Sequence, residues 1–373
     1  MAHEAGIVCA RNGVGAHLAA VMAKRSAAWL AAREALQEDG DAVRPTMEHG
    51  VQPKTLDMLS ANQTKCITFL LLGFQNPLFV NRMLFVLFLV IYILTLVGNL
   101  LIIILVAKFP SLKSPMYFFL TQLSLCDILL TTNIAPNMLH VIIDRGSIIS
   151  FSGCITQLYF HGTSTAAECY LLTVMSYDRF LAICRPLHYT SIMNLRLQLH
   201  FIILCWTSAF LVSFPVMLLT ANLQFCGPYV IDHYFCDFEP LLELSCSDNT
   251  ILELVQNAIG IPSGLFPFFF ILFTYIYIFI TIFGISSTTG RQKAFLTCSS
   301  HLTVVSTFYG TIIAIYLFPS KGQSSTVNKL ISLLLSMGTP FLNPIIYSLR
   351  NQEIKKTLIE CISKSLEAKK TIM

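Results

Sequence analysis

From about residue 83 onward, long runs of apolar residues alternate with short polar segments. Each run reaches the roughly 20 residues that an α-helix needs to cross a bilayer. Backbone groups in lipid must find their hydrogen-bond partners within the segment, so runs of this length predict helices. We place seven spans at residues 83–107, 115–139, 154–183, 198–220, 254–284, 295–318 and 329–349. The pattern predicts an all-α membrane protein built as a seven-transmembrane-helix bundle.

Charged residues are rare in these runs, and one adjacent pair marks the end of the third. Asp178 and Arg179 lie there, shortly before Arg185 and Pro186. Because a charge at the bilayer centre is costly, the pair is expected at a membrane edge, where the two side chains can bind each other and be released. The alternative is an anchoring arginine whose head extends to the lipid headgroups.

Two carboxylates, Asp127 and Glu168, are expected at mid-depth in the second and third spans. Unpaired in hydrocarbon, both would tend to take up a proton. Carboxylate and hydroxyl oxygens suit a hard cation, so the pair is a candidate ion site. The alternative is a hydrogen-bonded pair that shares one proton.

Composition agrees with a membrane protein, because 55% of the residues are hydrophobic and only 12% are charged. Soluble domains carry roughly twice that charged fraction. The net charge of +4 matters less than its distribution, since Lys and Arg gather in alternate loops, whereas the opposite loops hold mainly Arg145 and Lys321. The first group comprises Lys108, Lys113, Arg185, Arg196, Arg291, Lys293, Arg350, Lys355 and Lys356. The positive-inside rule then places the amino terminus outside the cell.

The two ends of the chain differ from the bundle. Residues 1–57 are Ala-rich and lack the apolar core of a signal peptide, so we interpret them as an upstream extension, disordered or loosely helical, or as a mis-assigned start with translation from Met47 or Met58. Residues 58–82 are expected to form an extracellular segment before the membrane-spanning region 83–350. Residues 351–361 are amphipathic and predict a short eighth helix on the cytoplasmic membrane surface, within a tail that runs to residue 373.

Five motifs occur in a fixed order along the chain. They are Pro115–Leu120 (PMYFFL), Met175–Cys184 (MSYDRFLAIC), Leu187–Met193 (LHYTSIM), Lys293–His301 (KAFLTCSSH) and Pro340–Asn351 (PFLNPIIYSLRN). In this order and spacing the chain resembles the odorant receptors, a branch of the rhodopsin-like G-protein-coupled receptors, from about Leu70 to Cys361.

The resemblance implies a plasma-membrane receptor that binds a small volatile odorant and activates a stimulatory heterotrimeric G protein, raising cyclic AMP. It also implies a sodium ion between Asp127 and Glu168. Phe180 replaces the tyrosine commonest in the family and Ser176 the alanine, and the missing hydroxyl of Phe180 puts coupling strength in doubt. The residues to which the resemblance assigns activation and G-protein coupling are Asp178, Arg179, His301, Asn343, Pro344 and Tyr347.

The outer side is expected to carry disulfides and a glycan. Cys154, Cys226, Cys236 and Cys246 would face an oxidising compartment, and four cysteines allow three pairings. The resemblance favours Cys154–Cys236 and Cys226–Cys246. Asn62 begins an N-glycosylation sequon. The loop 226–253 holds six acids and no Lys or Arg, which we interpret as a solvated lid rather than a cation site.

Helical spacing predicts the ligand cavity. His161, Thr165 and Glu168 are four and three residues apart and share one face of the third span. The candidate ligand-binding residues are His161 and Thr165, Ile259 and Ser263, Tyr309, Ile312, Ile313 and Tyr316, and Ser336. They would form a mostly apolar cavity between the outer halves of the third, fifth, sixth and seventh spans. The alternative is that these side chains pack as ordinary bundle core.

Other classes of function find little support in the sequence. It contains no His-Glu-x-x-His, no Gly-x-Ser-x-Gly and no phosphate-binding Gly-rich loop, so we expect no enzyme. No basic face suggests a nucleic-acid partner, and the lipid bilayer is the expected surrounding. The remaining alternatives are a rhodopsin-like receptor for a non-odorant ligand and a membrane transporter, which would commonly show internal repeats.

Overall fold

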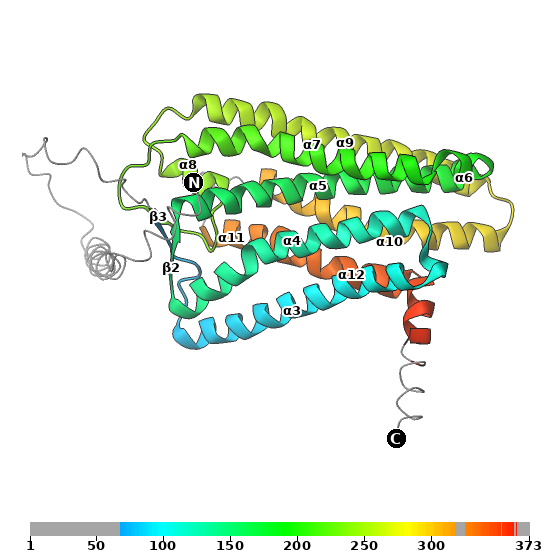
Figure 1. Cartoon of the computed structure of the whole chain (residues 1–373), viewed down its shortest axis with the longest axis horizontal. Helices are drawn as coiled ribbons and strands as arrows, with labels where there is room; N and C mark the ends of the chain where they lie inside the picture. Colours follow the sequence, from blue (N-terminus) through cyan, green and yellow to red (C-terminus); the bar gives the residue numbers. More distant parts are fainter. Residues whose placement is uncertain (1–67, 318–324, 352, 362, 364–373) are drawn as a thin grey trace, which may run out of the picture. The chain divides into compact units, whose positions relative to one another are not determined.

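Long helices joined by short loops make up the described part of the chain, which in this computed structural model covers residues 68–317, 325–351, 353–361 and 363. The chain divides into two units, Met1–Ile67 and Thr68–Met373, and all described residues belong to the second. The expected extension 1–57 and the sequon at Asn62 therefore lie outside the described residues. The bundle helices of Figure 1 are α3 (Leu78–Lys108), α4 (Pro115–Asp144), α5 (Phe151–Cys184), α7 (Leu195–Ala221), α9 (Thr250–Gly284), α10 (Thr288–Leu317), α11 (Ser325–Leu333) and α12 (Thr339–Arg350).

The helix faces that point away from the bundle are apolar and exposed, as a bilayer requires. Phe79 of α3 and Phe266 of α9 are each 73% exposed, and Leu211 of α7 is 70% exposed. Such a surface on a soluble protein would be an aggregation liability. Six helices of the described region are long and apolar enough to span a membrane. This agrees with the predicted multi-span bundle.

Helix α5 is not among those six, because it is more polar, and it is the central helix of the bundle. It packs against α4, α7, α9 and α10. Its buried residues include Glu168, Asp178 and Arg179. A helix enclosed by other helices needs no continuous apolar surface towards lipid, so hydropathy underestimates this span.

The seventh span contains a break that the sequence pattern did not predict. A π-helical turn, Leu334–Gly338, separates α11 from α12. Pro340 at the start of α12 has no backbone N–H to donate to the preceding turn, which favours such a distortion. The hydroxyl of Thr339 donates to the Leu334 carbonyl at 3.3 Å, and the side chain of Asn99 donates to the Pro340 carbonyl at 3.2 Å. Helix α3 is thereby bound to the broken segment.

Every predicted span except the second begins earlier in the structure, and two of them differ the most. Helix α3 starts at Leu78, directly after Pro77, rather than at residue 83. Helix α10 starts at Thr288 rather than at residue 295. In both cases the helix continues beyond the apolar core into the polar rim, where hydropathy gives no signal.

A small sheet, absent from the all-α prediction, lies at the end of the bundle where α8 (Phe238–Glu243) is found (Figure 1). Strand β1 (Thr68–Leu71) is central, with β2 (Ser147–Ser150) antiparallel and β3 (Val230–Ile231) parallel to it. The chain then turns at Gly73, whose φ is +63° and whose Cα faces the side chain of Val141 so closely that a Cβ would collide. The segment before the first span is thus held between the loop that carries β2 and the loop that carries β3.

The eighth helix is present, with residues 353–361 helical. Ile354 is buried and Leu358 packs against the core, whereas Lys355 and Lys356 are exposed. This is the amphipathic pattern expected for a helix at a membrane surface.

Candidate functional site

A cavity of about 520 Å³ lies between α5, α7, α9 and α10. Its volume falls within the roughly 300–1,000 Å³ usual for small-molecule sites. The lining is mostly aliphatic and aromatic, with few polar side chains. The cavity therefore suits a small, weakly polar molecule.

Most of the predicted ligand-binding residues line this cavity. They are His161 and Thr165 of α5, Ile259 and Ser263 of α9, and Tyr309, Ile312 and Ile313 of α10. The side chain of Tyr316 lies outside the described part of the structure. The expectation that Ser336 lines the cavity is wrong, because Leu335 does so instead. Ser336 is fully buried and donates to the Ser332 carbonyl at 2.8 Å. The π-turn, which shifts the helical register, accounts for this error.

Several lining residues were missed by the sequence analysis. Helix α7 contributes four of them, Val212, Ser213, Val216 and Met217. The loop between α7 and α9 contributes Asp237 and Phe238. We call the segment Cys226–Cys246 of this loop the lid. The available signal was that Asp237 directly follows a cysteine expected to bridge to α5.

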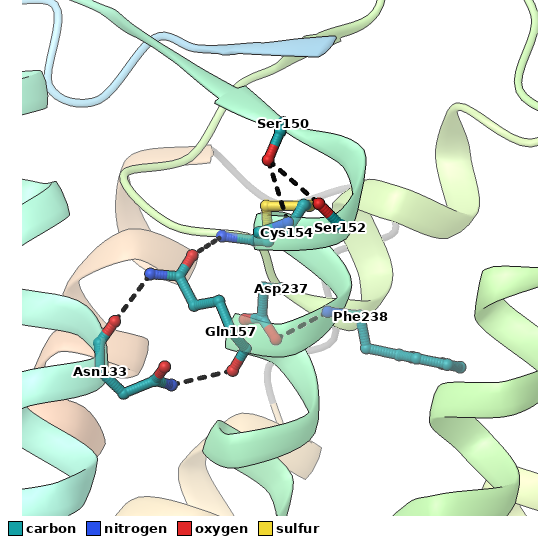
Figure 2. The surroundings of a disulfide bond; sticks show 9 residues. Asn133, Ser150, Ser152, Cys154, Gln157, Asp237 and Phe238 are labelled. Atoms are coloured by element: carbon teal, nitrogen blue, oxygen red, sulfur yellow. Dashed lines mark hydrogen bonds between the residues drawn. A yellow bond between two sulfur atoms is a disulfide. The ribbon is translucent and has the colours of Figure 1, made fainter. Parts of the chain in front are cut away.

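Two disulfides fix the lid, in the pairing that the resemblance implies. Cys154 at the start of α5 is bonded to Cys236, and Cys226 is bonded to Cys246. Figure 2 shows how hydrogen bonds reinforce the first bridge: the Cys236 backbone N–H donates to Oε1 of Gln157 at 2.9 Å. Gln157 in turn exchanges hydrogen bonds of 2.9 and 2.8 Å with Asn133 of α4. The lid is thereby attached to two helices.

A buried lysine joins the lid to the seventh span. Lys329 of α11 is 5% exposed. Its ammonium group donates to Oδ1 of Asp232 in the lid at 2.6 Å and to the Gly73 carbonyl at 2.9 Å. One side chain therefore connects the lid, the segment after β1 and α11.

His233 lies inside the lid between two aromatic rings. The ring centroids of Tyr234 and Phe235 are 4.5 and 4.7 Å from its own. Neither of its ring nitrogens has a hydrogen-bond partner among the described residues. Burial, with the nearby Lys329 ammonium, lowers the pKa of His233 to about 4, against the opposing effect of Asp237. The imidazole is therefore neutral at pH 7.

In mid-bundle, Asn343 of α12 brings the two predicted carboxylates together. Its amide nitrogen donates to both oxygens of Asp127 at 3.1 Å and to Oε1 of Glu168 at 3.3 Å. Oε2 of Glu168, Oδ1 of Asn343 and Oγ of Ser124 are buried and have no partner among the described residues. Among the described residues, no group of three or more His, Cys, Asp or Glu is placed to hold a metal.

At the opposite end of α5 from the lid, Asp178 and Arg179 form the expected ion pair. Nε and Nη2 of Arg179 donate to Oδ2 of Asp178 at 3.1 and 2.5 Å. Oδ1 of Asp178 accepts from the hydroxyl of Tyr189 at 2.8 Å. Tyr189 begins the short helix α6 (Tyr189–Ile192) in the next loop. Its bond to Asp178 was not predicted, because nothing in the sequence places this loop against α5.

The other predicted activation residues are buried within the bundle. His301 of α10 is fully buried, with one ring nitrogen 2.7 Å from the Tyr275 hydroxyl and the other 3.2 Å from the Leu172 carbonyl. The hydroxyl of Tyr347 is buried without a partner in the described structure. Pro344 packs closely on Gly98 of α3, where an added Cβ would lie 3.0 Å from the proline ring.

Comparisons with known proteins agree with this arrangement. A family model described as olfactory receptor matches residues 88–365. Human olfactory receptor 10A7 is 46% identical over 309 residues, covering 83% of this chain and 98% of that protein. Mouse olfactory receptor 5G29 is 43% identical over 302 residues, covering 80% and 95%. Among solved structures, squid rhodopsin aligns with a TM-score of 0.63 at 18% identity, covering 77% of this chain and 82% of that one.

Proposed function

Because the chain belongs to the olfactory receptor family and has the fold of rhodopsin-like G-protein-coupled receptors, we propose that it detects a small volatile odorant and signals through a stimulatory heterotrimeric G protein, raising cyclic AMP. Family and fold are those of a signalling receptor rather than of an enzyme or a transporter. The observation that carries the proposal is the cavity of about 520 Å³. Its apolar lining supplies affinity by burial, and its few polar groups supply orientation.

Helix α10 connects the cavity to the opposite end of the bundle. Tyr309 lines the cavity, and His301 lies eight residues earlier on the same helix, roughly 12 Å away at the helical rise. A ligand packed against Tyr309 favours the position of α10 that fits it best. It can shift the equilibrium between inactive and active states only by the difference in its affinity for the two.

The Asp178–Arg179 pair is the proposed latch of the inactive state. Its two side chains are almost entirely enclosed, at 0% and 10% exposure. In the active state Arg179 leaves Asp178 and contacts the G protein, while His301, Asn343, Pro344 and Tyr347 rearrange beside it. The hydrogen bond from Tyr189 supports this proposal, because it ties the loop carrying α6 to the inactive pair.

A sodium ion is proposed to bind between Asp127 and Glu168. The residues fit such an ion, because two carboxylates meet at one amide and further buried oxygens lack partners in the described structure. Oxygen ligands suit a hard cation. Replacing sodium by a large organic cation should raise basal signalling, and Glu168→Gln should remove that dependence. Signalling of the wild type that is indifferent to sodium favours a shared proton instead.

We also propose that the receptor resides in the plasma membrane with its amino terminus outside. The disulfide-bonded lid supports this orientation, because disulfides persist in oxidising compartments. Asn62 would then carry a glycan, and Asn62→Gln should lower the apparent mass of the band on a gel by one glycan. A wild-type band insensitive to glycosidase would count against this topology or against use of the sequon.

The proposed function is tested by measuring cyclic AMP against a panel of volatile molecules in cells that display the receptor at the surface. Arg179→Ala should abolish the response to an active volatile at equal surface expression. The matched control is Arg185→Ala, which removes an exposed arginine at the end of α5 and should respond normally. A full response from the Arg179 variant would overturn the coupling role of that residue.

A further inference from the structure

In the described structure the cavity is lined by one carboxylate, which lies at the end formed by the lid. Among its described lining residues Asp237 is the only carboxylate, and none is a lysine or an arginine. Asp237 comes from the lid, whereas the aliphatic residues Val216, Ile259 and Ile312 come from the bundle. The molecule that fills the cavity therefore meets one anion and no side-chain cation of the described structure.

The carboxylate of Asp237 keeps hydrogen-bonding capacity for a ligand. Its Oδ1 accepts from the backbone N–H of Phe238 at 2.8 Å, which caps α8. Its Oδ2 accepts from the hydroxyl of Ser332 at a long 3.4 Å. A carboxylate can accept about four hydrogen bonds. The hydrogen bonds that the structure shows for the Lys329 ammonium group go to Asp232 and to the Gly73 carbonyl.

His161 of α5 lines the same cavity as Asp237. The His161 ring also packs on Phe235 of the lid, with centroids 5.2 Å apart. A neutral imidazole offers one N–H donor and one acceptor nitrogen. The cavity end thus presents a strong acceptor next to a group that can donate.

From this end we infer that the ligand carries a hydroxyl group, and that Asp237 selects it. The inference rests on the proposed odorant-binding function of the cavity. A hydroxyl has one donor and two acceptor lone pairs, so it can donate to Asp237 and accept from His161. Its apolar skeleton then lies along the aliphatic wall.

Other polar classes fit this end less well. A carboxylate ligand would face Asp237 with no lysine or arginine in the described lining to offset the repulsion. An ammonium ligand would be attracted to Asp237, but it would also have to give up its water, which is costly unless all three of its donors find partners. Aldehydes and ethers have no donor to offer the carboxylate.

The test uses sets of matched probes on purified receptor. Each set holds the alcohol, the methyl ether, the carboxylic acid and the amine of one carbon skeleton, with octyl, 2-phenylethyl and menthyl as the skeletons. Ligand-induced stabilisation against thermal unfolding gives an apparent Kd for each probe. The alcohol should bind roughly tenfold to hundredfold more tightly than its ether, since a hydrogen bond to a charged group is at stake. The acid should bind most weakly.

Asp237→Asn removes the charge while its side-chain oxygen can still cap α8. This variant should bring alcohol and ether to within about threefold, because a neutral hydrogen bond contributes less, and should tighten binding of the acid. The control, Glu243→Gln, removes an exposed acid from the same short helix outside the cavity and should leave the ranking unchanged.

The outcomes separate this inference from the function on which it rests. Probe binding that Ile313→Trp weakens, but without a preference for alcohols or an effect of Asp237→Asn, overturns the inference alone. A preference for amines or acids over alcohols also overturns it. If Ile313→Trp leaves probe binding intact, or if no probe binds, the cavity is not the odorant site. Both the proposed function of the cavity and the inference about the hydroxyl group then fail.

Discussion

Removing the negative charge of Asp178 should make the receptor active without ligand. In the structure this carboxylate accepts two hydrogen bonds from Arg179 and one from Tyr189. Burial and the adjacent Asp178 carboxylate raise the pKa of Tyr189, so its hydroxyl stays protonated and donates. Asp178→Asn keeps the size of the side chain but weakens all three bonds.

The expected size of the effect follows from these contacts. A net loss of roughly 1.5–3 kcal/mol is typical when a hydrogen bond to a charged group is weakened. If the loss falls on the inactive state, the ratio of active to inactive receptor rises about ten- to hundredfold. A receptor active about 1% of the time would then be active roughly 10–50% of the time.

The assay is basal cyclic AMP without ligand, at matched surface expression. Tyr189→Phe, which deletes only the 2.8 Å bond, should raise basal signalling less than Asp178→Asn does. The control is Tyr177→Phe, which removes a hydroxyl from the residue next to Asp178 on α5. The Tyr177 ring packs on Phe180. Basal signalling of Asp178→Asn at or below the wild-type level, with full surface delivery, would refute the latch.

Three further predictions concern the lid. Cys154→Ser removes the disulfide to Cys236, which closes a loop with a sequence separation of 82 residues. The free energy of unfolding in detergent should therefore fall by about 4 kcal/mol on the chain-entropy estimate. An unchanged melting temperature would contradict this. Lys329→Met removes the ion pair between Lys329 and Asp232, and agonists should dissociate faster because the lid is less firmly held. Since His233 has a pKa of about 4 in the fold and about 6.5 when unfolded, the unfolded state binds more protons between these values. The wild type should therefore lose about 3 kcal/mol of stability as pH falls from 6.5 to 4, and His233→Phe should lose less.

The spans and the polar pairs were accessible from the sequence because their signals are local. A run of apolar residues predicts a helix whatever it packs against, and Asp178 next to Arg179 is already a pair within the chain. Asp127 and Glu168 were both expected at mid-depth, and the resemblance to the family placed a shared site between them. The structure adds Asn343 as the group that joins them.

What the sequence did not predict depends on contacts between distant segments. Strand β1 is too short to be recognised by alternation and exists because β2 and β3 flank it. The π-turn shifts the register of the seventh span, so Leu335 rather than Ser336 reaches the cavity. Asp237 looked like one acid of a solvated loop, and only the fold of the lid places it against the ligand cavity.

The central claim is that the cavity between α5, α7, α9 and α10 binds the activating odorant. It is tested most directly by concentration–response curves for one identified agonist on Thr165→Leu and Ile313→Trp, which fill the cavity. Ile280→Trp is the control, because Ile280 lies on α9 at 64% exposure and outside the cavity lining. Overpacking costs roughly 1–3 kcal/mol, so potency should fall roughly five- to hundredfold in both cavity variants and stay unchanged in the control, at equal surface expression. Wild-type potency in both cavity variants would place the odorant elsewhere.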